Sequence, residues 1–181
     1  MGPFRRAAQR KLQHGVTLIE LLVTAAILAV LIAVVAPGLS GLIKDARLSS
    51  QTDALVAALN LARLEAISRR ADVTLCATDN PDATSPVCSS ATTATAVAAA
   101  WGNGWLVMMG TTVLQRFPPK NGVTYTPAST TAKDATFSGT LGSASGATQV
   151  TLCLSGRKQQ AVTIAASGHV SKSVSSSTTC V

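Results

Sequence analysis

The chain has 181 residues, of which 47% are hydrophobic and only 3% aromatic, with a formal net charge of +7 and four cysteines. This length suffices for one membrane-length helix and one modest soluble domain. The sequence has no nucleophile elbow, phosphate-binding loop or metal-spaced cluster of His, Asp and Glu. We therefore expect neither an enzyme nor a metal or other cofactor.

The N-terminal part joins a basic leader to a long apolar run. Residues 1–15 carry four cations and no acid, and residues 16–36 contain polar groups only at Thr17, Glu20 and Thr24. At about 1.5 Å per residue the run makes a helix of roughly 31 Å, about the thickness of a bilayer core. The basic leader predicts a cytoplasmic N-terminus, so the rest of the chain lies in the periplasm of a bacterium.

Residues 1–36 allow three ordinary interpretations. A secretory signal peptide cut after Ala36 would leave Pro37 directly behind the cut, which hinders processing, and Glu20 is unusual inside its apolar region. A membrane anchor that is never cleaved is the second alternative. A buried core helix is the third, and the length of the run argues against it.

The junction resembles the prepilin signal of type IV pilins and type II secretion pseudopilins, in the string His14-Gly15-Val16-Thr17-Leu18-Ile19-Glu20. The resemblance implies that a prepilin peptidase cuts between Gly15 and Val16, and that the new α-amino group of Val16 is N-methylated. Glycine offers the peptidase a flexible, unhindered peptide. The common residue after the cut is phenylalanine, so Val16 departs from the family but keeps its hydrophobicity.

The same resemblance gives Glu20 the role of the assembly charge, paired with the α-amino group of a neighbouring subunit. A charge at the bilayer centre costs about 2.5–3.5 kcal/mol on insertion scales and less near the edge. Pairing with a cation offsets this cost. The alternative is a carboxylate that reaches out to the lipid headgroups.

Apolar periodicity resumes directly after Pro37-Gly38. It predicts one long helix over about residues 17–70, bent or locally melted near Pro37, with an amphipathic second half that packs on a sheet. Alternating β patterns then appear at residues 73–76, 149–154, 162–164 and 170–174. An apolar strand is predicted at 105–109, after the turn Gly102-Asn103-Gly104, with 111–117 as its hairpin partner. The Ser/Thr/Ala stretch at residues 89–100 predicts a surface loop.

Later strings narrow the resemblance to the GspH/FimT family of minor pilin-like proteins. They are residues 62–76, Trp101-Gly102-Asn103-Gly104-Trp105 and Leu152-Cys153. The implied fold is α+β, a pilin-like lollipop with a long N-terminal helix packed on a C-terminal antiparallel β domain. It divides the chain into a leader (1–15), a transmembrane half-helix (16–36), a periplasmic half-helix (37–71) and a periplasmic β domain (72–181).

All four cysteines fall on the expected periplasmic side, where disulfides form. They contain no C-x-x-C pair, which argues against zinc or redox chemistry. Of the three pairings, we favour Cys76 with Cys88 and Cys153 with Cys180, each worth about 2–4 kcal/mol. Free buried thiols are the alternative.

The C-terminal third is basic, because it has six cations and one acid from Arg116 onward. One interpretation is an ordinary solvated surface, and the other is a phosphate-binding face. Some FimT-type proteins bind DNA through a C-terminal G-R-x-R motif. The matching string here, Gly168-His169-Val170-Ser171, lacks both arginines. If DNA binds, the expected contacts are Arg157, Lys158, His169 and Lys172.

The resemblance implies a minor pilin-like subunit that helps to assemble or prime a type IV pilus. The subunit crosses the inner membrane once, with a periplasmic soluble domain that enters the pilus. Its expected partners are the prepilin peptidase, other pilins or pseudopilins and the membrane. The alternatives are a type II secretion pseudopilin, a pilus-associated DNA-binding protein for DNA uptake and a conventional secreted binding module.

Overall fold

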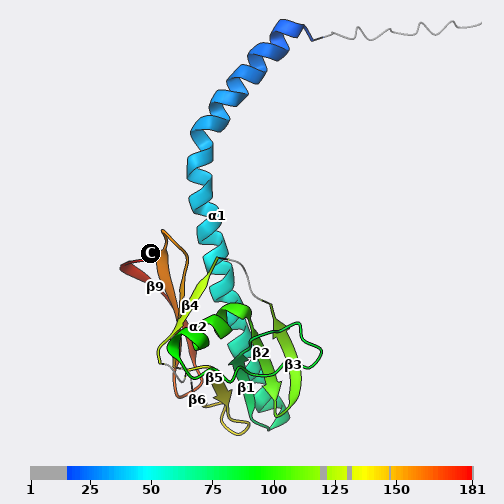
Figure 1. Cartoon of the computed structure of the whole chain (residues 1–181), viewed down its shortest axis with the longest axis vertical. Helices are drawn as coiled ribbons and strands as arrows, with labels where there is room; N and C mark the ends of the chain where they lie inside the picture. Colours follow the sequence, from blue (N-terminus) through cyan, green and yellow to red (C-terminus); the bar gives the residue numbers. More distant parts are fainter. Residues whose placement is uncertain (1–15, 119–121, 130–131, 147, 181) are drawn as a thin grey trace, which may run out of the picture. The chain divides into compact units, whose positions relative to one another are not determined.

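The computed structural model describes residues 16–118, 122–129, 132–146 and 148–180, without the side chains of residues 34–38 and 176–179. The chain divides into two compact units, Met1–Gly41 and Leu42–Val181. Helix α1 (Leu18–Arg69) begins in the first unit and ends in the second (Figure 1). Its backbone stays helical through Pro37 and Gly38, so the local melting considered there is absent. A proline removes one backbone hydrogen bond from a helix, and the turns on either side keep their hydrogen bonds.

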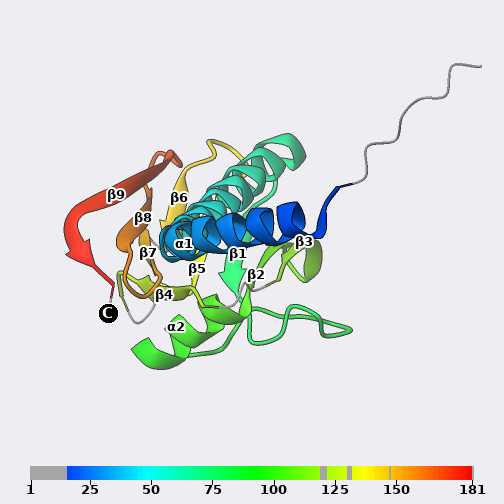
Figure 2. The ribbon, with the colours of Figure 1, turned by 90° about the horizontal axis from the view of Figure 1, so that it is seen from above.

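The second unit contains two antiparallel sheets. The five-stranded sheet has the order β3-β2-β1-β5-β6, and the four-stranded sheet has the order β4-β7-β8-β9 (Figures 1 and 2). The strands of the first sheet are β1 (Val73–Ala77), β2 (Trp105–Met109), β3 (Thr112–Phe117), β5 (Asp134–Phe137) and β6 (Ala144–Gly146). Those of the second are β4 (Thr124–Pro127), β7 (Gln149–Cys153), β8 (Lys158–Ile164) and β9 (Val170–Thr179). The α+β fold expected from the sequence, a long N-terminal helix followed by antiparallel sheets, is therefore confirmed.

The core lies between the C-terminal part of α1 and both sheets. The helix contributes an apolar stripe at spacings of three, four and seven residues, which places it on one face. Its members are fully buried: Leu48, Leu55, Ala58, Leu59, Ala62 and Ala66. The sheets meet this stripe with alternate residues of their strands, such as Val73 and Leu75 of β1 and Val162 and Ile164 of β8.

An unpredicted helix, α2 (Ala94–Asn103), lies where the sequence predicts a surface loop. Thr93 caps it, because its hydroxyl accepts a hydrogen bond from the backbone N–H of Ala96 at 3.3 Å. Val97, Ala100 and Trp101 are buried at helical spacing, and the Trp101 indole N–H donates to the carbonyl of Ala132 at 3.0 Å. The loop prediction was wrong because a run of small residues reads as low complexity, whereas alanine is the best helix former once it has a surface to cover.

Tyr125 of β4 belongs to the aromatic part of the core, which is centred on Trp105. Its ring meets Trp105 edge-on at a centroid distance of 5.7 Å, and its hydroxyl donates to the buried Gln51 side chain of α1 at 3.1 Å. Burial raises the pKa of the Tyr125 phenol well above its ordinary value. The folded state therefore holds this proton more tightly than the unfolded state does.

This burial predicts a stability loss in alkali. Below pH 10 the contribution is constant, and above it the free energy of unfolding should fall by up to about 1.4 kcal/mol per pH unit, because unfolding releases the proton. Tyr125→Phe should flatten this loss, although it should cost about 1–3 kcal/mol at neutral pH by leaving Gln51 unpaired. Tyr125 is the only tyrosine, so tyrosinate absorbance should appear only as the domain unfolds. A tyrosinate midpoint near pH 10 in the folded protein would contradict the prediction.

Candidate functional site

The start of α1 is capped by Thr17. The backbone N–H of Glu20 donates to the Thr17 hydroxyl at 3.3 Å, and the N–H of Leu21 donates to the Thr17 carbonyl at 3.2 Å. Glu20 is thus the third residue after the cap and lies in the first turn, where a carboxylate stabilises the positive end of the helix dipole. Sequence reasoning missed this second role, although Thr-x-x-Glu is the pattern of a capping box.

The cleavage site itself is only partly described. Gly15 and the leader lie outside the described residues, and Val16 is exposed just ahead of the helix. Cleavage after Gly15 would therefore free an α-amino group one residue before the cap, and four residues before Glu20.

The helix is apolar and exposed on all sides over the described side chains from residue 18 to 33. Every large hydrophobic residue in that stretch exposes half or more of its surface: Leu18, Ile19, Leu21, Leu22, Val23, Ile27, Leu28, Val30, Leu31 and Ile32. The hydroxyl of Thr24 donates to the carbonyl of Leu21, so one of the few polar groups is satisfied within the helix. A helix that is hydrophobic all round needs an apolar surrounding. Over the residues described, no helix satisfies the length and apolarity requirements for crossing a membrane.

Two disulfides brace the second unit. Cys76 of β1 is bonded to Cys88, and Cys153 at the end of β7 is bonded to Cys180, the pairings favoured from the sequence. The second bond joins the end of β7 to the residue that follows β9, and the N–H of Cys180 also donates to the carbonyl of Arg157 in the β7–β8 turn at 2.8 Å. The C-terminal segment is therefore tied to the domain, with β9 as the edge strand of the four-stranded sheet.

The candidate DNA contacts do not form a free basic face. The Arg157 guanidinium donates through two nitrogens to the Asp45 carboxylate of α1, with an Nε–Oδ1 distance of 2.6 Å. This hydrogen bonding raises the pKa of Arg157 further. Lys172 of β9 lies 2.5 Å from the Asp53 carboxylate, also on α1. Two of the four predicted contacts are thus paired with acids that are far away in the sequence.

The other two predicted contacts are exposed at opposite ends of the β8–β9 hairpin. Lys158 is at the start of β8, and His169 is in the turn just before β9. Gly168 in that turn has a positive φ of 79° and packs against the carbonyl of Gly142. The glycine of the apparent G-R-x-R match therefore has a packing role within the fold.

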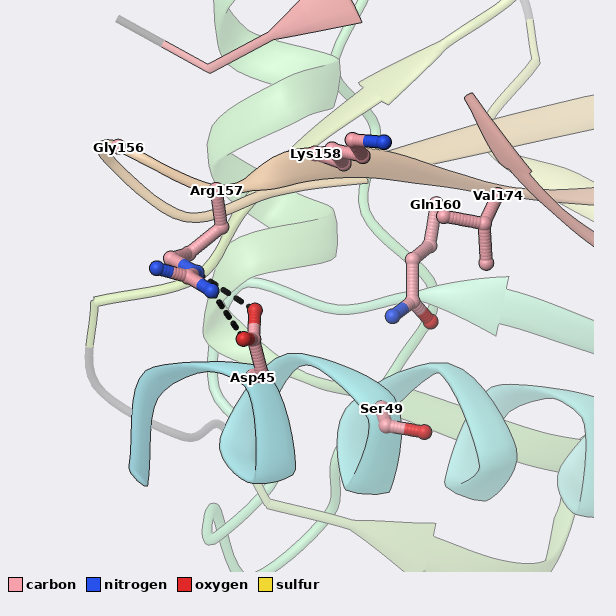
Figure 3. A pocket seen from close by; sticks show the side chains of 7 residues that line it. All are labelled: Asp45, Ser49, Gly156, Arg157, Lys158, Gln160 and Val174. Carbon is pink, nitrogen blue, oxygen red and sulfur yellow. Dashed lines mark hydrogen bonds and ion pairs between the residues drawn. The ribbon is translucent and has the colours of Figure 1, made fainter. Parts of the chain in front are cut away.

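An open cavity of about 500 Å³ lies between α1 and the outer end of β8 (Figure 3). Its lining residues are Asp45, Ser49, Gly156, Arg157, Lys158, Gln160 and Val174. The Arg157–Asp45 ion pair lies at one end, and the Gln160 amide points from the strand toward the helix (Figure 3). Sequence reasoning found Arg157 and Lys158 but had no signal for the cavity. No group of three or more His, Cys, Asp or Glu that could hold a metal ion occurs among the residues described.

A long helix with an apolar, exposed N-terminal part, followed by antiparallel sheets that bury its C-terminal part, defines a pilin-like subunit. The chain belongs to the family described as type II transport protein GspH, whose profile matches residues 51–168. The prokaryotic N-terminal methylation motif matches residues 10–36, which include the junction described above.

Solved structures support the same fold. The type IV minor pilin FimU of Pseudomonas aeruginosa is 18% identical, with a TM-score of 0.53 over 73% of this chain and 95% of FimU. A second crystal form of FimU gives a TM-score of 0.51 at 18% identity, over 71% of this chain and 98% of FimU. No protein with a curated description matches the chain in sequence.

Proposed function

We propose that this chain is a minor pilin-like subunit that helps to assemble or prime a type IV pilus. In this proposal a prepilin peptidase removes residues 1–15, Val16 is N-methylated, and the first half of α1 anchors the subunit in the inner membrane with the domain in the periplasm. The observation that carries the proposal is the capped helix start followed by an apolar surface on all sides of the helix. Such a surface requires lipid before assembly and neighbouring helices afterwards.

Glu20 has two roles in this proposal, charge pairing and helix capping, and they can be separated. Its carboxylate belongs to the first turn of α1, close to where the mature chain would begin. In the filament it would pair with the α-amino group of a neighbouring subunit, because a buried charge without a partner is costly. A capping-box contribution of Glu20, by contrast, needs only a polar side chain at that position, although its interaction with the helix dipole needs the charge.

A pair of Glu20 substitutions distinguishes the two roles. Glu20→Ala removes both the cap contribution and the charge, whereas Glu20→Gln keeps a capping side chain and removes only the charge. We expect both variants to be processed normally and both to enter sheared surface filaments at a severalfold lower level than the native protein. Filament levels restored by Glu20→Gln would show that capping, and not charge pairing, matters.

The same strains test the runner-up, a pseudopilin of a type II secretion system. A pilus subunit predicts fewer surface pili in the Glu20 variants with unchanged export of secreted enzymes. Normal pili together with reduced export would replace the pilus proposal with the secretion one.

A further inference from the structure

The polar cavity beside β8 holds an unsatisfied hydrogen-bond acceptor. Gln160 is half-buried, and its Oε1 atom is buried without a hydrogen-bond partner among the described residues. A buried acceptor without a donor costs about 1–3 kcal/mol, so nearly all such groups in folded proteins are paired. An N–H or O–H donor from outside the chain would complete this site.

The placement of Gln160 follows from strand geometry. Gln160, Val162 and Ile164 alternate along β8 and therefore share the face toward α1, whereas Lys158 lies at the start of the strand, where the pairing with β9 is irregular. Val162 and Ile164 are buried in the core, but the two outer positions are polar. Gln160 points across the cavity toward the helix that carries Asp45 and Ser49, and Lys158 also lines the cavity, with its side chain directed away from the helix (Figure 3). The cavity exists because the apolar stripe of α1 ends at Leu48 while the strand continues.

The lining also offers positive charge. Arg157 and Lys158 carry two positive charges against the one negative charge of Asp45. Asp45 takes two of the Arg157 N–H groups and leaves the others available. Lys158 is exposed, and its side chain has no ion pair or hydrogen bond within the described part of the chain. The site therefore suits a ligand with one negative charge and a nearby N–H donor.

We propose that this cavity binds an acidic side chain, together with its own peptide N–H, from a neighbouring subunit of the filament. The carboxylate pairs with Lys158, the peptide N–H donates to Gln160 Oε1, and Val174 at the rim supplies apolar contact. The volume lies within the roughly 300–1,000 Å³ of ordinary ligand sites. Because β9 is the edge strand of its sheet, an incoming segment reaches the cavity without displacing a strand. Duplex DNA fits less well, since its backbone phosphates have no N–H or O–H donor for Gln160.

Binding is tested on the full mature chain in detergent by ligand-observed NMR titration. The probe is N-acetylglutamate N-methylamide, and its neutral isostere is N-acetylglutamine N-methylamide. We expect saturable binding, with about a fivefold preference for the charged probe, which is the size of one partly exposed ion pair. Lys158→Gln should abolish the preference for the charged probe, and Gln160→Leu should weaken the binding of both probes. Lys44→Gln removes the same charge from an exposed position outside the lining and should change neither.

The identity of the partner rests on the proposed function and needs a second measurement. Lys158→Glu should lower entry into filaments severalfold, and Lys44→Glu should not. Absence of saturable binding, no preference for the charged probe, or equal effects of Lys158→Gln and Lys44→Gln would overturn the site and leave a cavity that takes only water. Normal assembly of Lys158→Glu with intact probe binding by the native protein would overturn the neighbouring subunit as partner. The Glu20 variants test the filament role without involving this cavity. A failure of the filament proposal can therefore be distinguished from a failure of the cavity proposal.

Discussion

Replacing Gly15 by valine should abolish maturation, so that the precursor accumulates in the membrane with residues 1–15 still attached. The peptidase must hold the peptide before the scissile bond in an extended, accessible form. Glycine allows this at no steric cost, whereas a β-branched residue restricts the backbone and crowds the site. Intact-mass measurement of the purified protein should show native chains beginning at N-methylated Val16 and variant chains beginning before it.

The matched control for this experiment is Val16→Phe. It places a larger side chain on the other side of the same bond, where phenylalanine is the common residue in the resembling family, and should be processed normally. Native chains that begin at Pro37 would instead identify residues 1–36 as a secretory signal peptide. Native chains that retain residues 1–15 would identify an uncleaved anchor, and either result would end the pilin proposal.

Replacing Gly168 by alanine should destabilise the domain by about 2–4 kcal/mol. A Cβ atom at this position would overlap the carbonyl oxygen of Gly142 and crowd the Arg63 guanidinium. Overpacking typically costs about 1–3 kcal/mol. A non-glycine residue at a positive φ adds about 1 kcal/mol. The effect should be large because this turn connects the β8–β9 hairpin to α1 and to β6. The Ser167 carbonyl accepts from Arg63 of α1, and the Ala166 carbonyl accepts from the N–H of Ala144 in β6.

Gly156→Ala is the control for backbone conformation alone. Gly156 also has a positive φ, of 77°, but nothing lies within 4 Å of an added Cβ. It should therefore lose only about 1 kcal/mol. Denaturant unfolding of the mature chain in detergent, followed by tryptophan fluorescence, reports on the domain alone, because both tryptophans of the sequence are buried in its core. Equal losses in the two variants would show that the contact with Gly142 does not matter.

The local features of this chain were predictable because short-range chemistry determines them. Helix periodicity predicted an end near Arg70 and the structure has Arg69. Alternating apolar residues located β1, β7 and β8, and an apolar run after a glycine-rich turn located β2. The short strands β4, β5 and β6 were missed, since three or four residues carry too little periodicity to stand out. Helix α2 was missed because its run of alanines shows no contrast between an apolar and a polar face. Its buried face is apparent only in the structure, where Trp101 is buried.

The sequence by itself determined the junction of leader and apolar run, the α+β class and the family resemblance, because each depends on residues that are adjacent or regularly spaced. Only the tertiary structure determined which of the basic residues form ion pairs. Arg157 and Lys172 are 112 and 119 residues away from the aspartates that neutralise them. Their contacts arise where the hairpin of β8 and β9 packs beside α1. Such pairing depends on how helix and sheet meet, and no local pattern encodes it.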